Sequence, residues 1–86
     1  MTAKKPQRIQ YHVMYSKERP VWIVTCDGED IDEWMRKENA VRAACDIARK
    51  TWTFEGIPTQ VKIHRKRGNT IQDERTFGND PYPPKG

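Results

Sequence analysis

The chain is poor in cysteine and has no long apolar run. Its two cysteines, Cys26 and Cys45, are too few for a disulfide scaffold and lack the paired spacing of a structural zinc site. No segment approaches the length of a membrane span, and no apolar run follows the basic start of the chain as it would in a signal peptide. We therefore expect a cytoplasmic protein with free thiols and no membrane partner.

The sequence also lacks the motifs of common catalytic sites. It has no phosphate-binding loop, no dinucleotide fingerprint and no nucleophile elbow. The main group of carboxylates lies between Asp27 and Glu33, in an expected solvated loop that would not hold them in the fixed positions that catalysis needs. The two cysteines and the two histidines, His12 and His64, include no pair at the short spacing of zinc ligands. We expect no enzyme, no cofactor and no metal site.

The charge balance is basic. Sixteen Lys and Arg residues against twelve Asp and Glu residues give a net charge of +4. The densest group of cations is Arg65-Lys66-Arg67, and the densest group of anions lies between Asp27 and Glu33. Such asymmetry attracts polyanions, although surface charge also serves solubility. A chain of 86 residues forms one small domain and has little room for a deep, water-excluding cavity.

Hydrophobic periodicity predicts four strands. Residues 9–15 alternate between apolar and polar, and residues 21–26 are rich in β-branched and aromatic side chains. The five residues between these segments form a turn that ends at Pro20, which predicts an antiparallel hairpin. Residues 60–65 alternate again, and residues 70–77 are polar enough to suit an edge strand.

One helix is predicted between the second and third of these strands. Its apolar stripe consists of Val41, Ala44, Cys45, Ala48 and Trp52. The clear interior runs over 37–50, and Gly56-Ile57-Pro58 should end the helix. The start is open, because Asp32 is a competent N-cap whereas the stripe is continuous only from Val41.

These elements define an α+β fold, a small antiparallel sheet in the order β-β-α-β-β with one helix packed on one face. Residues 1–8 are expected to form a flexible basic arm, residues 9–77 the single domain and residues 78–86 a tail rich in proline and glycine. The tail either packs over Trp22, Trp34 or Trp52 or stays free for the aromatic groove of a partner. Packing is favoured for residues 77–81, and both alternatives stay open for residues 83–86.

The end of the chain resembles a family of small bacterial domains of unknown function. Members close with "IH", a turn of basic residues and glycine, and "GNDPxPPKG", which correspond here to Val61 to His64 and to the tail. This chain departs from the family pattern in Trp34-Met35-Arg36, where a hydroxyl cap usually opens the helix, and in Arg67-Gly68-Asn69, where Asp-Gly is usual. The rest of the resemblance lies in Tyr11-His12-Val13, the strand with Trp22 and the alanine-rich helix from Ala40 to Arg49. The resemblance implies no activity.

Two surfaces suit a polyanion. A sheet covered by one helix would expose His12, Met14, Lys62 and His64 on its other face, with Tyr or Trp rings at the margin to stack bases. The loop formed by Arg65, Lys66 and Arg67 can contact phosphates. The ordinary alternatives are a solvated polar face and a charged turn that increases solubility.

Two hypotheses of function follow. The first is a small non-enzymatic nucleic-acid-associated accessory protein that binds through His12, Lys62, His64, Arg65, Lys66 and Arg67. The second is a protein-protein interaction adaptor or homodimeric regulatory module that uses a sheet edge or the proline tail and does not bind nucleic acid.

Overall fold

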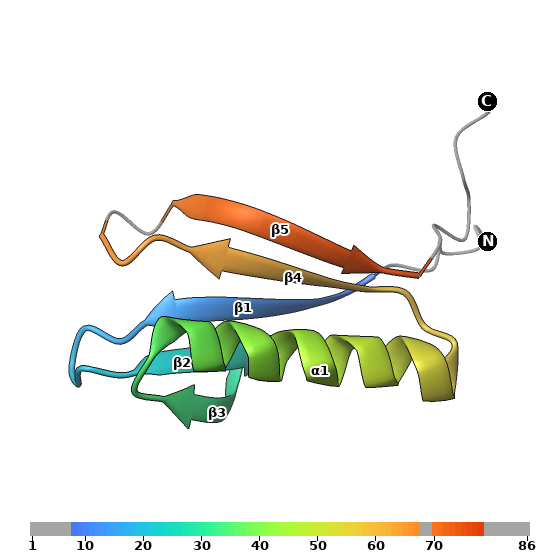
Figure 1. Cartoon of the computed structure of the whole chain (residues 1–86), viewed down its shortest axis with the longest axis horizontal. Coiled ribbons are helices and arrows are strands. Elements are labelled where there is room, and N and C mark those ends of the chain that lie inside the picture. The colour runs from blue at the N-terminus through green and yellow to red at the C-terminus, as the bar shows by residue number, and fades with distance from the viewer. Residues whose placement is uncertain (1–7, 68–69, 79–86) are drawn as a thin grey trace, which may run out of the picture.

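The computed structural model describes residues 8–67 and 70–78. They form an α+β domain in which one helix lies across a five-stranded sheet (Figure 1). The strands lie side by side in the order β3-β2-β1-β4-β5. The elements are β1 (Ile9–Tyr15), β2 (Trp22–Cys26), β3 (Glu29–Trp34), α1 (Lys37–Glu55), β4 (Thr59–His64) and β5 (Ile71–Phe77).

The acidic segment that we expected to be a loop forms the strand β3. The element order is therefore β-β-β-α-β-β and not β-β-α-β-β. Asp27 and Gly28 both have positive φ, 53° and 82°, and form the tight turn that joins β2 to an antiparallel β3. The carboxylates of β3 are compatible with a strand because β3 lies at the edge of the sheet, where water reaches them.

The sheet is mixed, which corrects the expected antiparallel sheet. The hairpin of β1 and β2 is confirmed, but β1 and β4 run parallel, with Ile9 opposite Thr59 and Val13 opposite Ile63. The wrong element order and the wrong direction of β4 relative to β1 have the same cause, the missed strand β3. With two strands before the helix, β4 would have been antiparallel to β1, and the third strand adds the reversal that makes them parallel. The last strand, β5, pairs antiparallel with β4 and forms the expected polar edge.

Small side chains bring α1 close to the sheet. Ala40, Ala44 and Ala48 are fully buried, as are Val13 and Val24 beneath the helix. The predicted burial of Ala44 and Ala48 is confirmed. Of the other predicted stripe residues, Val41 and Cys45 pack partly against this core, and Trp52 is half-buried. The centre of the stripe thus lies on the alanine row, because alanine lets a helix pack nearer to β-branched residues than a larger side chain would.

The ends of α1 differ in how they are capped. Asp32 belongs to β3 and not to the helix, so the N-cap alternative at Asp32 is wrong. The N-cap is Arg36, whose backbone is extended and whose side chain makes no capping hydrogen bond. At the other end Gly56 adopts φ 70°, and its N–H donates to the carbonyl of Trp52 at 2.9 Å. The predicted end of the helix at Gly56 is confirmed.

Arg8 connects three backbone segments by hydrogen bonds, at the end of the sheet where β1 and β4 begin. Its guanidinium donates to the carbonyls of Thr59 and Phe77, each at 3.1 Å, and to that of Gly78 at 3.0 Å. These bonds join the start of β1 to the start of β4 and the end of β5. The expectations for residues 1–7 and for the proline tail after Gly78 lie outside the described residues.

Candidate nucleic-acid interface

The helix covers one face of the sheet and leaves the other without a helix (Figure 1). Because side chains alternate along a strand, Tyr11 and Val13 point under the helix and His12 points to the opposite face. On β4, Val61 and Ile63 are buried under the helix in the same way. We call the opposite face the uncovered face, and it carries Gln10, His12, Met14, Gln60, Lys62 and His64.

Two predicted site residues on this face are in contact. Nδ1 of His12 and Nε2 of His64 lie 2.9 Å apart and share a hydrogen bond, with the ring centroids 5.1 Å apart. His64 is only 8% exposed, and its Nδ1 is buried without a hydrogen-bond partner among the described residues. Lys62 is the register partner of His12 on the neighbouring strand. The parallel pairing of β1 with β4 therefore brings together His12, Lys62 and His64.

The surroundings of His12 favour its neutral form. Partial burial is the main cause that lowers the pKa of the His12 imidazole below its ordinary value of 6.5. The neighbouring His64 and the ammonium of Lys62 lower this pKa further, because each opposes an added positive charge. At neutral pH the His12 ring is therefore uncharged, and the hydrogen bond joins an N–H of one ring to a nitrogen acceptor of the other.

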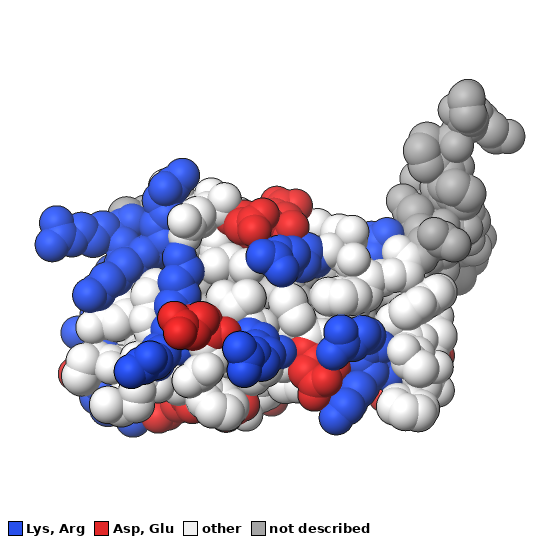
Figure 2. All heavy atoms as spheres, viewed as in Figure 1, with Lys and Arg blue, Asp and Glu red and all other residues white. Residues whose placement is uncertain are grey.

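Three loops meet at one end of the sheet. The strands β1, β3 and β4 are parallel to one another, so the loops that follow them lie at the same end (Figure 1). Figure 2 shows Lys and Arg side chains gathered at this end of the molecule. We call it the basic end, and its cations are Lys17, Arg36, Lys37, Arg65, Lys66 and Arg67.

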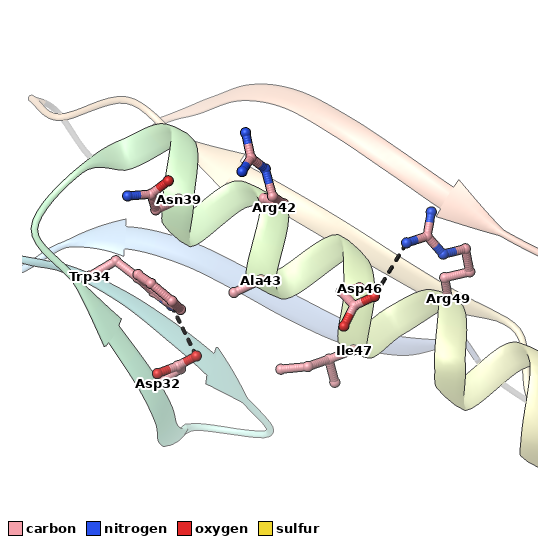
Figure 3. Close-up of a pocket in the computed structure, with 8 residues that line it drawn as sticks. All are labelled: Asp32, Trp34, Asn39, Arg42, Ala43, Asp46, Ile47 and Arg49. Atoms are coloured by element: carbon pink, nitrogen blue, oxygen red, sulfur yellow. Dashed lines mark hydrogen bonds and ion pairs between the residues drawn. The ribbon is translucent and has the colours of Figure 1, made fainter.

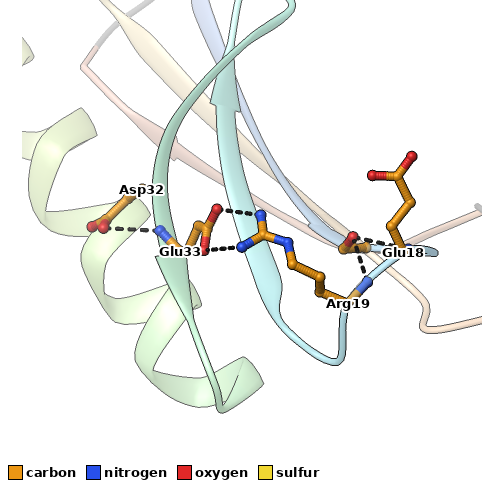
Figure 4. A network of polar contacts seen from close by, with 5 residues as sticks. Glu18, Arg19, Asp32 and Glu33 are labelled. Atoms are coloured by element: carbon orange, nitrogen blue, oxygen red, sulfur yellow. Dashed lines mark hydrogen bonds and ion pairs between the residues drawn. The ribbon is translucent and has the colours of Figure 1, made fainter.

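Few of these cations are neutralised by described residues. In the β1–β2 turn, Arg19 is paired with the carboxylate of Glu33 on β3 (Figure 4), so it is not counted in the basic end. Arg36 lies 4.0 Å from Glu38, and both side chains are largely exposed. No ion pair between described residues involves Lys17 or any of residues 65–67. Among the described residues, positive charge outside ion pairs therefore gathers at the basic end.

Two lysines of the basic end lie over aromatic rings. Nζ of Lys66 is 4.7 Å from the centroid of Tyr15, and Nζ of Lys37 is 5.3 Å from the centroid of Trp22. Such cation–π contacts hold an ammonium near the protein without neutralising its charge. The uncapped first turn of α1 adds backbone N–H groups and the positive end of the helix dipole at the same place.

The aromatic rings expected at the margin of the uncovered face lie on the other face. Tyr15 and Trp22 pack edge to face on the helix side, with centroids 5.1 Å apart. Trp34 is the register partner of Trp22 and lies on that side as well. Among residues 8–67 and 70–78, the uncovered face thus presents no Phe, Tyr or Trp ring on which a base could stack.

The structure places the predicted residues in two groups. His12, Lys62 and His64 lie on the uncovered face, and the exposed residues 65–67 follow directly at the basic end. The sequence interpretation missed the contributions of Lys17, Arg36 and Lys37. These residues could have been found only from the topology, because parallel strands end at the same edge of a sheet and their following loops lie together there. The parallel pairing was itself not predicted.

A groove runs along the other side of the domain, between β3 and α1 (Figure 3). It has a volume of about 570 Å³, and Trp34 is 37% exposed in its wall. The indole Nε1 of Trp34 donates to Asp32 at 2.9 Å, and Arg49 donates to Asp46 at 3.2 Å. In the groove, these polar side chains are therefore hydrogen-bonded to one another.

Other kinds of site receive no support within the described part of the chain. There, no three His, Cys, Asp or Glu side chains are placed to hold a metal ion. Cys26 and Cys45 are free thiols, half-buried in β2 and α1. Over the same residues, no helix combines the length and the apolar character needed to cross a membrane.

The fold defines a small α+β domain with a basic end. A family model described as "Uncharacterized protein conserved in bacteria (DUF2188)" matches residues 11–77, and the chain belongs to this family. The match includes all five strands except the start of β1, and it ends before the proline tail. Comparisons with curated proteins and with solved structures give no match.

Proposed function

We propose that this chain is a small non-enzymatic protein that binds nucleic acid through phosphate contacts at the basic end. The observation that carries the proposal is the meeting of three loops at one end of the sheet, with Lys17 and residues 65–67 in no ion pair between described residues. Cations so grouped attract a polyanion more strongly than the same charges spread over the surface. Each phosphate that they neutralise releases condensed counterions, which favours binding.

The side chains present point to the phosphate backbone as the main contact. The uncovered face supplies Lys62 and two imidazoles, and among described residues it supplies no ring for stacking. Single-strand binders rely on such rings, whereas a duplex offers a higher density of phosphates. We therefore expect a duplex to bind more tightly than a single strand of equal length, with little preference for sequence.

A second function is favoured by the opposite side of the domain. The edge strand β3 borders the groove that contains Trp34, and Met35 beside it is 77% exposed. An edge strand next to an exposed aromatic side chain suits the addition of a strand from a protein partner or a second copy of the chain. The alternative proposal is thus a protein-protein adaptor or homodimeric module that does not bind nucleic acid.

Fluorescence anisotropy distinguishes the two proposals. Labelled single-stranded and duplex DNA and RNA are titrated with the protein at two salt concentrations. Changing Arg65, Lys66 and Arg67 together to Ser should weaken binding and reduce the salt slope by up to about three, because each lost phosphate contact removes roughly one released counterion.

A matched control is available on the helix. Changing Arg42, Arg49 and Lys50 to Ser also removes three charges, so both variants have a net charge of 4 − 3 = +1. These three exposed residues lie on α1, whose later turns run away from the basic end. The control should keep most of the affinity and of the salt slope. Equal losses in both variants would show a nonspecific effect of net charge.

The unmodified protein gives the decisive result. If it does not bind any of the four nucleic acids at low salt, where electrostatic association is strongest, the nucleic-acid proposal is wrong. The adaptor proposal would then be tested by light scattering after size exclusion, with Trp34→Ala as the variant that should weaken self-association.

A further inference from the structure

The His12–His64 pair is placed where its charge would act on a ligand of the basic end. His64 is the last residue of β4 and directly precedes Arg65, the first cation of the following loop. The pair is buried enough to be held in one arrangement, since His64 is 8% exposed and its Nε2 lies 2.9 Å from Nδ1 of His12. Phosphate contacts alone do not explain why two imidazoles share a hydrogen bond at this position.

The groups beside His12 oppose its protonation in the free protein. From β4, the ammonium of Lys62 lies opposite His12. The register partners on the outer neighbours are uncharged, Thr25 on β2 and Ile71 on β5. On β5, Glu74 is the register partner of Lys62, and its carboxylate accepts a hydrogen bond from Gln60 at 3.1 Å. The helix α1 lies on the opposite face, and the loop cations 65–67 add positive potential.

We propose that binding of a phosphodiester backbone at the basic end is coupled to the uptake of one proton by the His12–His64 pair. This inference rests on the proposed function, and it assigns to the pair a role that the basic loop alone does not have. The ligand class is a nucleic-acid backbone, whose phosphates supply the negative charge that the free site lacks.

The geometry favours one proton rather than two. A singly protonated pair keeps its hydrogen bond, because an imidazolium N–H donates to the neutral ring of the partner and charge strengthens such a bond. A second proton would turn both facing nitrogens into donors and break the contact. The added proton comes from solvent, and a ring N–H not used within the pair becomes a donor toward a phosphate oxygen. No covalent bond forms or breaks.

Linkage fixes the sign and the size of the expected effect. A ligand that binds the protonated form more tightly binds better as pH falls, and uptake of one proton changes the association constant by at most tenfold per pH unit. Histidine is the side chain whose ordinary pKa lies in this range, so the dependence near pH 6 to 7 reports the imidazoles.

The experiment measures the affinity of a labelled duplex by anisotropy from about pH 8 to about pH 5.5 at constant ionic strength, the range in which histidine titrates. The affinity of the unmodified protein should rise by up to tenfold per pH unit as pH falls. His12→Gln, which keeps a polar side chain of similar reach, should lose most of the pH dependence, whatever its affinity is at the high-pH end.

A second measurement needs no substitution. Histidine ring resonances of the unmodified protein are titrated by NMR without and with the unlabelled duplex, and calorimetry in buffers of different ionisation enthalpy counts the protons taken up. We expect the pair to titrate at higher pH in the complex, with up to one proton bound per duplex site. This readout remains available if substitution of the buried His64 unfolds the domain.

The outcomes separate the two proposals. Duplex binding with an affinity independent of pH, or with zero protons taken up, overturns the coupling and leaves the proposed function standing. Retention of the full pH dependence by His12→Gln also overturns it. Failure of the unmodified protein to bind duplex or single strand at low salt across this pH range overturns the proposed function, and the coupling with it.

Discussion

The backbone of Gly78 lies directly against the indole ring of Trp52. A Cβ placed on Gly78 would be 2.5 Å from both Cδ2 and Cε3 of that ring, closer than carbon atoms can approach. Gly78 also has a φ of 87°, which L side chains rarely adopt. This position, directly after β5, therefore requires glycine for two independent reasons, its backbone conformation and the space taken by Trp52.

Gly78→Ala should destabilise the domain more than Gly28→Ala. Gly28 has a similar φ of 82° but no atom within 4 Å of a Cβ placed on it, so it reports the conformational strain alone. We expect a loss of about 1–2 kcal/mol at Gly28 and a further 1–3 kcal/mol or so at Gly78 from the clash. Urea denaturation followed by tryptophan fluorescence measures both.

Removing the ring provides the control for this prediction. In the Trp52→Ala background the Gly78→Ala change should cost about as much as Gly28→Ala, because only the strain remains. Equal losses at Gly78 and Gly28 in the unmodified background would contradict the contact between Gly78 and Trp52.

A buried charge on the alanine row should unfold the domain. Ala44 is fully buried between α1 and the sheet, so Ala44→Asp places a carboxylate where no described partner can compensate it. The cost is several kcal/mol, on the order of the whole stability of a small domain. Circular dichroism should show loss of structure. Ala43→Asp is the control, since Ala43 is half-buried beside the open groove. A folded Ala44→Asp protein with unchanged melting would contradict the helix packing.

Periodicity located most of the fold, and one missed turn accounts for the rest. The hairpin of β1 and β2, the helix interior, its end at Gly56 and the polar edge strand all follow from local patterns. The segment Glu29–Trp34 was misinterpreted because its four carboxylates resemble a solvated loop. Asp27-Gly28 directly follows the predicted strand 21–26, and this pair is a strong signal for a tight hairpin, which the prediction of a loop leaves out.

The sequence allowed individual residues of the candidate site to be predicted, but not which of them lie in contact. Alternation placed His12 and His64 on the same face, yet their 2.9 Å contact depends on β1 and β4 being parallel neighbours. The grouping of Lys17 with residues 65–67 depends on the same topology. Local sequence patterns do not encode which distant strands pair, because that choice is made by the packing of the whole sheet.

Both cysteines should be free and slow to react in the folded protein. Cys26 lies in β2 and Cys45 in α1, and partial burial is the main cause that raises the pKa of each thiol. Since the thiolate is the reactive form, a raised pKa slows modification at neutral pH. A colorimetric thiol reagent should count two thiols in denaturant without reductant and react much more slowly without denaturant. A count of zero in denaturant would mean that a disulfide joins them.

The stability of the domain should fall as pH falls through the titration range of histidine. The pKa of His12 in the folded protein lies below its ordinary value of 6.5, mainly because of burial, so the unfolded chain binds a proton more readily there. Protons then favour the unfolded state, and the stabilisation present above pH 6.5 is lost as pH falls toward the folded-state pKa. The effect should be modest, because His12 is only partly buried. Urea midpoints measured between about pH 8 and about pH 5 should show the decrease, and His12→Gln should remove most of it.

The ion pairs of Asp46 with Lys50 and Arg49 lower the pKa of that carboxyl below 3.8, so their loss occurs in a separate, more acidic range. A midpoint that stays constant or rises as pH falls from 7 to 5 would contradict the placement of His12 beside His64 and Lys62.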